Sequence, residues 1–419
     1  MVDGYYSEKN MKFREYQKNI IDKGTEIIKD HGFIYLAMEV RTGKTLTSLG
    51  ICNNLKINSV LFITKKKAIS SIVDDYNKYD PNYFLEVINY ESLHKVKQTD
   101  WDVVICDESH SLGAFPKPNK RAKQVREIIN RSNPFVILLS GTPTPESYSQ
   151  MYHQVYGIPN NPFNKFKNFY AFSKVHIKVK QKFINSIYIN DYTKGLKSII
   201  DEMSPFKINY SQKMAGFKTT IEEKILYVNL SSVCLSLIKK IKKDRVIEGK
   251  GEIVLADTGV KLMSKVHQLC SGTVKFESGK SMVVDTTKAK FINKFFKDQK
   301  IGIFYKFKEE YNAIKKIYKD MITNDLEEFN ATEKSIALQI VSGREGISLK
   351  EASALVYYNI DFSATSYWQS RDRMTTKNRA TNKIYWIFSN DGIENEIYKT
   401  VVKKKDYTLT HFKRDLLDL

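Results

Sequence analysis

Residues 33–45 read FIYLAMEVRTGKT, and this stretch decides the fold class. The run FIYLAME at 33–39 predicts a buried strand, and the residues after it predict a helix from Lys44 to about Leu55. A turn between a strand and a helix start directs backbone N–H groups and the positive end of the helix dipole toward an anion. The stretch therefore predicts an α/β fold with a phosphate-binding loop.

The residues of the run EVRTGKT suit the phosphates of ATP. Gly43 would let the backbone approach closely, Lys44 would neutralise the β- and γ-phosphates, and Thr45 would bind Mg²⁺. Arg41 and Thr42 lie within the same run and are assigned to the nucleotide with it.

The match to the full phosphate-loop pattern is incomplete. The pattern G-x-x-x-x-G-K-[ST] would place a glycine at position 38, where this chain has Met38. A chance GKT at a helix start is the alternative interpretation of this segment taken alone.

A second polar segment, VVICDESH at 103–110, also follows an apolar run. Asp107 and Glu108 come at the carboxyl end of a predicted strand, and ligands of open α/β sheets bind at that edge. Asp107 could hold Mg²⁺ directly or through water, and Glu108 could orient and deprotonate an attacking water. A polar turn after a buried strand is the alternative, and the phosphate loop on the same sheet disfavours it.

Short apolar strands alternate with helices over much of the chain. In the first third, strands are predicted at 59–64, 84–89, 102–108 and 135–140, and helices at 71–79 and 120–130. After residue 300, strands are predicted at 301–307, 335–341, 354–359 and 383–389, and helices at 309–318 and 366–373. This alternation predicts parallel sheets that are covered on both faces.

The middle of the chain differs from both ends. It is rich in Lys, Phe and Tyr, and it predicts helices at 192–203, 228–244 and 258–270. We therefore expect a first lobe over 1–155, a helical insertion or linker over 156–215, and a second lobe with a helical insertion over 216–419. Two α/β lobes joined in this way predict a ligand in the cleft between them.

The charge of the chain indicates a polyanionic partner. Its 419 residues include 67 Lys and Arg against 47 Asp and Glu, which gives a formal net charge of +20. Nucleic acid and an anionic membrane surface are the polyanions that such a chain would bind. The candidate basic patches lie at 117–121, 165–182, 239–245 and 403–405.

Several classes of protein are excluded by the same sequence. No run of 18 apolar residues is present, so we expect no membrane span, and the first residues lack the apolar core of a secretory signal. The four cysteines are scattered, which disfavours a zinc site and favours free thiols in a reducing compartment. A cytoplasmic location is expected, in a bacterium or in a phage-infected host.

Taken together, the motifs resemble those of superfamily-two helicases, and most closely the Snf-type DNA-dependent ATPases. In the first lobe the resemblance rests on FREYQ (13–17), EVRTGKT (39–45), INYESL (88–93), WDVVICDE (101–108), DESH (107–110) and LSGTPTPES (139–147). In the second lobe it rests on IFYKF (303–307), SGREGISL (342–349) and SYWQSRDR (366–373), which are similar to motifs IV, V and VI. The resemblance implies two RecA-like lobes, ATP and Mg²⁺ as cofactors, and DNA as the partner.

The resemblance also implies roles for single residues of the first lobe. Gln17 would read the adenine, as the upstream glutamine does in this family. Ser140 and Thr142 would couple the state of the nucleotide to the DNA track, and His110 would sense the nucleotide or this coupling segment. Thr64 and Lys65 would touch the phosphates of the nucleic acid.

In the second lobe, Gln369 and Arg373 would reach the γ-phosphate, and Ser342 would contact nucleic acid. An arginine of this kind is typically worth on the order of 10³–10⁵ in rate. The family usually has a further arginine three residues after Arg373, where this chain has Thr376. Lys377, Arg379 or Arg371 could substitute for it, and the spacing does not decide among them.

Four functions stay open. The first is an ATP-driven DNA translocase or helicase that tracks double-stranded DNA. An RNA helicase is the second, although DESH disfavours its DEAD-box form. A nucleic-acid-binding scaffold without ATPase activity is the third, and Met38 and Thr376 motivate it. The motor subunit of a restriction system is the fourth, in which cleavage would need a partner protein.

Overall fold

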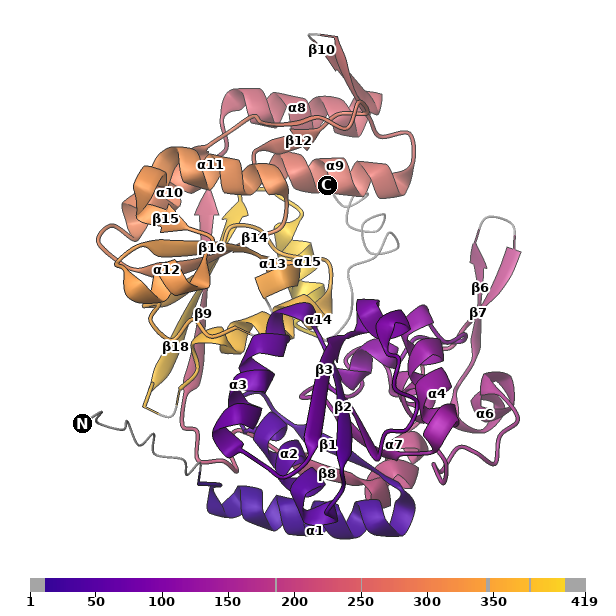
Figure 1. The fold of residues 1–419 in the computed structure, drawn as a ribbon. Coiled ribbons are helices and arrows are strands. Elements are labelled where there is room, and N and C mark those ends of the chain that lie inside the picture. Colours follow the sequence, from indigo (N-terminus) through magenta and orange to yellow (C-terminus); the bar gives the residue numbers. More distant parts are fainter. Residues whose placement is uncertain (1–11, 185–186, 250, 344–346, 377, 404–419) are drawn as a thin grey trace, which may run out of the picture. The chain divides into compact units, whose positions relative to one another are not determined.

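The computed structural model describes residues 12–184, 187–249, 251–343, 347–376 and 378–403. The chain divides into two compact units, Met1–Phe217 and Lys218–Leu419. Each unit is built on a six-stranded sheet (Figure 1). Every strand pair in both sheets is parallel, so the predicted α/β class with two parallel sheets is confirmed.

Among its described residues, the first unit contains a six-stranded sheet, a separate two-stranded sheet and seven α-helices. Its strands in spatial order are β3 (Phe84–Asn89), β2 (Ser59–Thr64), β4 (Val103–Cys106), β5 (Phe135–Leu139), β1 (Phe33–Met38) and β8 (Lys207–Tyr210). Its helices are α1 (Glu15–His31), α2 (Lys44–Leu55), α3 (Ile69–Tyr79), α4 (Lys120–Ser132), α5 (Met151–Val155), α6 (Phe169–His176) and α7 (Ser198–Met203).

Alternate residues of the strands face two separate hydrophobic cores. On β1, Phe33 and Tyr35 pack with α4 to α7, whereas Ile34 and Leu36 pack with α1 to α3. Because successive side chains of a strand point to opposite faces, a sheet covered on both sides needs apolar residues at every position. This requirement explains the uninterrupted apolar run FIYLAM.

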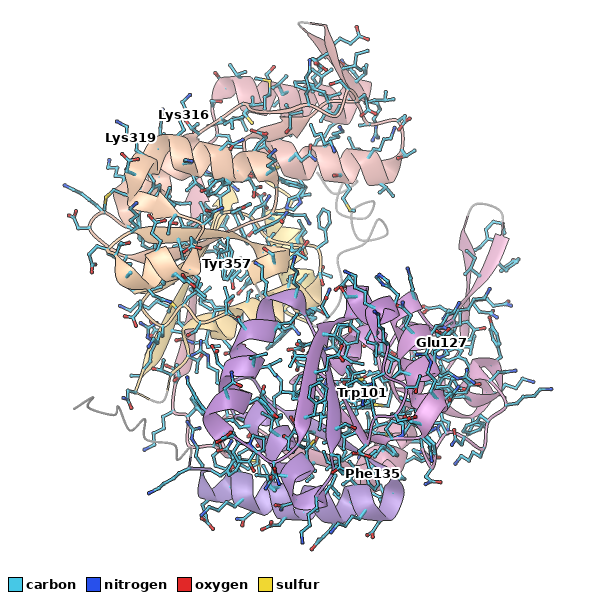
Figure 2. The ribbon with its side chains drawn as sticks, viewed as in Figure 1. Trp101, Glu127, Phe135, Lys316, Lys319 and Tyr357 are labelled. Atoms are coloured by element: carbon cyan, nitrogen blue, oxygen red, sulfur yellow. The ribbon has the colours of Figure 1, made fainter. Side chains whose placement is uncertain are left out.

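The second unit repeats this plan. Its strands in spatial order are β15 (Ile322–Thr323), β16 (Ser335–Gln339), β14 (Ile301–Tyr305), β17 (Ala354–Tyr357), β18 (Thr381–Ser389) and β9 (Thr220–Val228). Its helices are α8 (Ser232–Asp244), α9 (Gly259–Cys270), α10 (Thr287–Phe295), α11 (Lys308–Tyr318), α12 (Leu326–Ala331), α13 (Ile340–Gly343), α14 (Ala364–Ser370) and α15 (Glu394–Val401). Tyr357 lies in its core, whereas Lys316 and Lys319 point outward at the end of α11 (Figure 2).

Three two-stranded hairpins were not predicted from the sequence. They are β6 (Lys180–Ile184) with β7 (Ile187–Asp191), β10 (Val246–Gly249) with β11 (Glu252–Leu255), and β12 (Thr273–Lys275) with β13 (Ser281–Val283). The insertions therefore contain hairpins as well as helices. In the described part of the chain, no helix is long and apolar enough to cross a membrane.

The helix predicted over 192–203 is wrong in its first half. Only Ser198–Met203 is helical. Ser149 Oγ donates to the Tyr192 carbonyl at 2.6 Å, and a Cβ on Gly195 would lie 2.6 Å from the Ser149 nitrogen. This stretch is held as an extended segment against the 3₁₀ turn Tyr148–Gln150, and that long-range contact overrides the local preference.

The segment 156–215 supplies structure to the first unit. Strand β8 pairs in parallel with β1, with Tyr35 opposite Lys207. Phe163 and Phe172 are fully buried in the same core as Phe33. The two units meet in the chain between Phe217 and Lys218.

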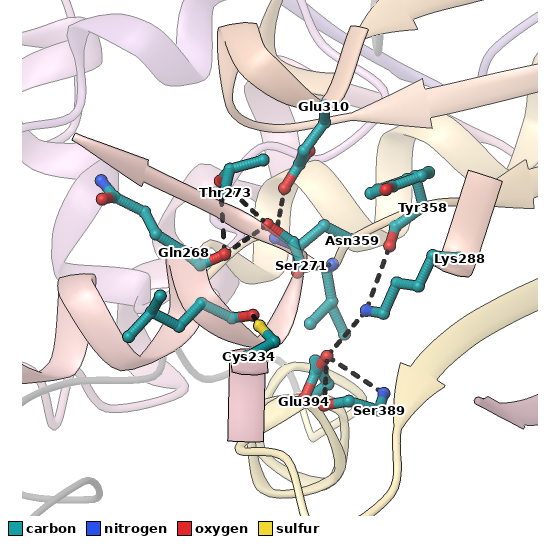
Figure 3. A network of polar contacts seen from close by, with 12 residues as sticks. Cys234, Gln268, Ser271, Thr273, Lys288, Glu310, Tyr358, Asn359, Ser389 and Glu394 are labelled. Carbon is teal, nitrogen blue, oxygen red and sulfur yellow. Dashed lines mark hydrogen bonds and ion pairs between the residues drawn. The ribbon is translucent and has the colours of Figure 1, made fainter. Parts of the chain in front are cut away.

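A buried ion pair ties α10 to α15 in the second unit (Figure 3). Lys288 Nζ lies 2.8 Å from Glu394 Oε1 and donates to the Tyr358 carbonyl at 3.4 Å. Both Lys288 and Glu394 are almost fully buried, and Glu394 also accepts from the Ser389 amide at 3.2 Å and the Ser389 hydroxyl at 3.1 Å. The charges are paired and hydrogen-bonded, which is the condition for burying them.

Removing one partner of this pair should strongly destabilise the second unit. We expect Lys288→Ala to lower the free energy of unfolding by about 3–5 kcal/mol, because Glu394 would stay buried without its counter-charge. Chemical denaturation followed by circular dichroism measures the change. Lys290→Ala, on the exposed side of the same helix, should change it by less than about 0.5 kcal/mol, and an equal effect of both variants would contradict a special role for the pair.

Candidate functional site

The predicted phosphate loop joins β1 to α2, and its backbone requires glycine at position 43. Gly43 precedes α2 with φ +79°, and a Cβ there would lie 2.4 Å from Gln17 Nε2. A side chain is therefore excluded both by the left-handed backbone and by the glutamine. Lys44 and Thr45 are the first two residues of α2, at the end where helix N–H groups have no internal partners.

The start of α1 is fastened to this loop. Gln17 Nε2 donates to the Gly43 carbonyl at 3.3 Å, and its Oε1 accepts from the Arg14 amide at 3.0 Å. The Tyr16 hydroxyl donates to the Thr42 carbonyl at 3.0 Å. Gln17 thus contacts the loop backbone, while its predicted contact with adenine stays a prediction.

Asp107 follows β4 and has one carboxylate oxygen to offer. Its Oδ2 accepts from the Thr64 hydroxyl at 2.9 Å, and its carbonyl accepts from the Tyr90 hydroxyl at 2.6 Å. Its Oδ1 is buried and has no hydrogen-bond partner among the described residues. Burial and the neighbouring Glu108 raise the pKa of Asp107, and Lys44 acts in the opposite direction.

These properties fit a divalent cation. A cation would satisfy the unpartnered oxygen and favour the ionised carboxylate, and oxygen donors are the ligands that Mg²⁺ prefers. Asp107 and the Thr45 hydroxyl are the groups of this site that would hold it. The described residues contain no group of three or more His, Cys, Asp and Glu side chains that could hold a metal by themselves.

Glu108 begins a row of polar contacts between the phosphate loop and β5. Its Oε1 lies 3.7 Å from Lys44 Nζ, and its Oε2 lies 3.3 Å from His110 Nδ1. His110 Nδ1 lies 3.0 Å from the Ser140 hydroxyl, which accepts from the Thr142 amide at 3.1 Å. The structure therefore brings together five predicted site residues from three separate motifs.

The backbone of Glu108 is itself unusual. Its φ of +48° lies in the left-handed region that residues other than glycine rarely adopt. Such conformations cost about 1–3 kcal/mol and persist where the surroundings enforce them. Here the conformation turns the chain from β4 into the 3₁₀ helix Ser109–Leu112, so that Glu108 and His110 both face the site.

The predicted contacts of the first unit with nucleic acid involve Thr64 and Lys65. Thr64 is fully buried and its hydroxyl donates to Asp107, so this side chain orients the carboxylate, and its contact with nucleic acid stays a prediction. Lys65 is half-buried at the start of the 3₁₀ helix Lys66–Ala68, and its contact with nucleic acid stays a prediction.

In the second unit, Gln369 and Arg373 lie on consecutive turns of α14 and the 3₁₀ helix Arg371–Met374. Arg373 Nε donates to the Gln369 carbonyl at 3.0 Å, and its Nη1 donates to the Ile347 carbonyl at 3.4 Å. Both side chains are buried. Ser342 is half-buried and donates to the Gln339 carbonyl at 3.1 Å, whereas residues 344–346 of the same motif lie outside the described residues.

Two of the three candidate substitutes for the second arginine are engaged elsewhere. Arg371 forms an ion pair with Glu223, and its guanidinium lies 4.5 Å from the centre of the Trp368 ring. Arg379 Nη2 donates to the Ala352 carbonyl at 2.7 Å. Lys377 lies outside the described residues.

Glu223 on β9 was not predicted as a site residue. It accepts hydrogen bonds from Arg371 and from three aromatic side chains, which are Tyr367, Trp386 at 2.9 Å and Tyr398 at 3.0 Å. It therefore anchors the segment that carries Gln369 and Arg373. The local sequence around Glu223, TIEEKILYV, does not indicate this role, because the partners of Glu223 lie 144 to 175 positions away in the sequence.

Gln212 was also missed. Its backbone amide donates to Glu39 Oε2 at 2.7 Å, and its side-chain amide donates to the Val40 carbonyl at 3.0 Å. The segment that leads to the boundary at Phe217 thus contacts the phosphate loop directly. Gln212 and Glu39 are separated by more than 170 positions in the sequence, so no local pattern could pair them.

Neutralising Asp107 should stabilise the metal-free protein. A carboxyl group whose pKa is raised on folding contributes stability only when protonated, and this contribution is lost as the pH rises through the folded-state pKa. At pH 7 we therefore expect Asp107→Asn to unfold with about 1 kcal/mol more free energy than the wild type, with EDTA present. The advantage should shrink as the pH falls toward the ordinary carboxyl pKa of about 4.

Thermal unfolding at pH 7 and pH 5 measures this difference. Asp100→Asn, at an exposed carboxylate just before β4, should leave the midpoint unchanged at both values. A less stable Asp107→Asn protein at pH 7 would contradict the conclusion that burial of the ionised carboxylate, with Oδ1 unpartnered, costs stability.

Sequence comparisons relate the chain to two families. The SNF2-related domain matches residues 55–274, which is more than half of the 419 residues. The res subunit of type III restriction enzymes matches residues 10–99, a stretch that contains the phosphate loop. No curated protein matches the chain with significance.

Solved structures with a similar course of the chain include two of one archaeal protein. The Sulfolobus solfataricus SWI2/SNF2 ATPase core in complex with dsDNA is 15% identical, with 94% of this chain and 91% of that chain covered and a TM-score of 0.43. The Sulfolobus solfataricus SWI2/SNF2 ATPase core domain is 16% identical, with 94% and 89% covered and a TM-score of 0.42.

The family match confirms the resemblance that the motifs carry. It spans β4 with Asp107 and Glu108 as well as the segment around Ser140. The two parallel sheets agree with two RecA-like lobes. The chain belongs to the SNF2-related domain family of helicase-like ATPases.

Proposed function

We propose that this protein is an ATP-dependent translocase that couples ATP hydrolysis to movement along double-stranded DNA. The observation that carries the proposal is the row of contacts from Lys44 through Glu108 and His110 to Ser140. This row links the residues suited to a triphosphate with the segment predicted to pass its state onward. A static binding site would not need such a link.

The proposed nucleotide site uses groups of the first unit. Lys44 and the N–H groups at the start of α2 hold the phosphates, and Asp107 and the Thr45 hydroxyl hold Mg²⁺. The bound cation would offset the negative charge of the triphosphate. Arg41, Thr42 and Gln17 shape the loop around it.

Glu108 is the proposed general base. Its Oε1 lies 3.7 Å from Lys44 Nζ. A γ-phosphate competes for the same ammonium group, because two anions share one lysine. The carboxylate is then available to accept a proton from the attacking water.

His110 and Ser140 are the proposed relay. His110 lies against both Glu108 and Ser140, so a shift of the glutamate changes the contact with the hydroxyl. Ser140 in turn accepts from the Thr142 amide. A change at the nucleotide thereby reaches the loop after β5.

Arg373 is proposed to stabilise the transferring phosphoryl group, with Gln369 beside it. Glu223 positions the segment that carries both residues. The net charge of +20 supports DNA as the polymer, and Lys65 and Ser342 stay proposed contacts with it. The cytoplasmic location predicted from the sequence stays a prediction.

Substitutions in the row should separate nucleotide binding from hydrolysis. We expect Lys44→Ala to lower both ATP binding and turnover, and Glu108→Gln to keep ATP binding while turnover falls by at least about 100-fold. Arg373→Ala should lower turnover by about 1000-fold or more with little change in ATP affinity. Steady-state phosphate release and binding of a fluorescent ATP analogue provide the two readouts.

Matched controls lie on α1. Lys23→Ala and Glu26→Gln remove an exposed ammonium and an exposed carboxylate of the same unit, and both should keep wild-type turnover. A wild type that binds DNA but releases no phosphate under any condition would support the scaffold in place of the motor.

The polymer can be identified by the stimulation of turnover. Duplex DNA should raise the ATPase rate more than single-stranded DNA or RNA of the same length. Binding should weaken with salt, with a slope of log K against log salt of about −0.9 for each phosphate that the protein neutralises. The largest stimulation by RNA would favour the RNA helicase, and equal rates with and without nucleic acid would defeat the motor.

The motor subunit of a restriction system is a second candidate, because the res-subunit match covers residues 10–99. That function predicts the same ATPase, together with cleavage of DNA only when a partner protein is added. Plasmid cleavage with and without a lysate of the source cells distinguishes the two candidates.

A further inference from the structure

The hairpin of β6 and β7 stands apart from the sheet of the first unit. Within the described part of the chain, its strands pair only with each other, from Lys180 opposite Asp191 to Ile184 opposite Ile187. Figure 1 shows it as a ribbon that projects from the unit. None of its described residues belongs to a hydrophobic core.

Two aromatic side chains on one face of this hairpin are exposed to solvent. Phe183 and Tyr188 are direct cross-strand partners, so they share a face, and their ring centres are 4.9 Å apart. They are 64% and 69% exposed. Burying a side chain of this size in a core would gain about 1.5–3 kcal/mol, so their exposure forgoes a stabilisation that the other aromatic clusters of the unit obtain.

The base of the hairpin is strongly basic. Between residues 177 and 197 the chain has five lysines and one carboxylate, Asp191. Lys178, Lys180 and Lys194 are exposed, and Lys194 lies close enough to Lys180 that this neighbour lowers the pKa of Lys194. Asp191 offsets only part of this repulsion, and its carboxylate also accepts from the Thr193 amide and hydroxyl at 2.9 and 2.7 Å.

We propose that this hairpin binds DNA at regions where the two DNA strands are unpaired. The lysines would contact the phosphates, and the bases would stack on Phe183 and Tyr188. Lysines that repel one another favour a polyanion between them. Aromatic side chains beside a basic track are the general means by which proteins hold single strands, because every base has a face to stack. In a duplex these faces are covered, so an exposed aromatic pair selects unpaired bases.

The hairpin proposal rests on DNA as the polymer of the proposed function and extends it. The motor would then distinguish a fork or an opened end from a continuous duplex. Basic residues alone would bind every form of DNA by its phosphates. The aromatic pair adds the preference for DNA with unpaired bases.

The first experiment measures the affinity of the full chain for three fluorescent DNAs, which are a blunt duplex, a forked duplex with unpaired arms, and a single strand. We expect Phe183→Ala with Tyr188→Ala to weaken binding to the fork and the single strand by about tenfold. Binding to the blunt duplex should change by less than about twofold. Phe84→Ala, which removes an aromatic side chain that is 56% exposed on β3, should leave all three affinities unchanged.

A second set of variants tests the lysines. Lys178→Gln, Lys180→Gln and Lys194→Gln together should reduce the salt slope on the single strand by up to about 2, at about 0.7 for each phosphate. The control makes the same change of charge at Lys290, Lys316 and Lys319, three exposed lysines of the second unit. If both sets change the slope equally, net charge explains the effect and the hairpin proposal is overturned.

Photocrosslinking identifies the contact without any substitution. A forked DNA with 5-iododeoxyuridine in its unpaired arm should attach to the tryptic peptide that runs from residue 183 to 194. An adduct only at other peptides, or unchanged affinity of the double alanine variant for the fork, overturns the proposal.

Measuring the ATPase rate distinguishes failure of the hairpin proposal from failure of the proposed motor function. If duplex DNA stimulates turnover but the double alanine variant binds the fork like the wild type, the hairpin proposal fails and the motor stands. If no DNA binds or stimulates the wild type, both fail. Thermal unfolding should be the same for wild type and variants, since the two aromatic side chains pack into no core.

Discussion

Two adjacent carboxylates, Asp107 and Glu108, have to be kept in place at the end of β4 next to a buried sheet, and Lys44 lies 3.7 Å from the second of them. Asp107 is held by the hydroxyl of Thr64, and Glu108 is held between Lys44 and His110. Burial and the neighbouring negative charge of Glu108 raise the pKa of Asp107, so holding this carboxylate in its ionised form costs free energy. A triphosphate bound together with its cation would favour the ionised form of the Asp107 carboxylate. The phosphate loop, the left-handed turn at Glu108 and the contact with Ser140 are all arranged around these two side chains.

The second unit uses buried charge in a different way. Lys288 with Glu394, and Arg371 with Glu223, are pairs whose carboxylate oxygens have hydrogen-bond partners (Figure 3 shows the first pair). These pairs tie helices to the sheet and leave no comparable unpartnered carboxylate oxygen at their centre. Their effect is positional, because the glutamate on β9 holds the segment on which Gln369 and Arg373 lie. The first unit therefore has a buried carboxylate oxygen without a hydrogen-bond partner at Asp107, whereas the carboxylates of these two pairs in the second unit are hydrogen-bonded.

The surface of the first unit adds a further element. The hairpin of β6 and β7 combines lysines with an aromatic pair that no core covers. A high net charge explains why a chain attracts a polyanion, but it does not explain exposed aromatic rings. Stacking on unpaired bases accounts for both features with one ligand. It also gives the proposed motor a means of sensing the form of its track.

Local patterns in the sequence were enough to place the central strands, the turn between β1 and α2 and the two carboxylates after β4, because apolar runs record burial within a few residues. They were not enough for the extended segment before α7, where a contact with Ser149 overrides helix preference. They also did not indicate that the Thr64 hydroxyl donates to Asp107. The partners of Glu223 and the contact of Gln212 with Glu39 depend on residues more than 140 positions apart. Only the folded chain brings such residues together, because the pairing of side chains across a sheet follows from the packing of the whole unit and leaves no periodic trace in the sequence.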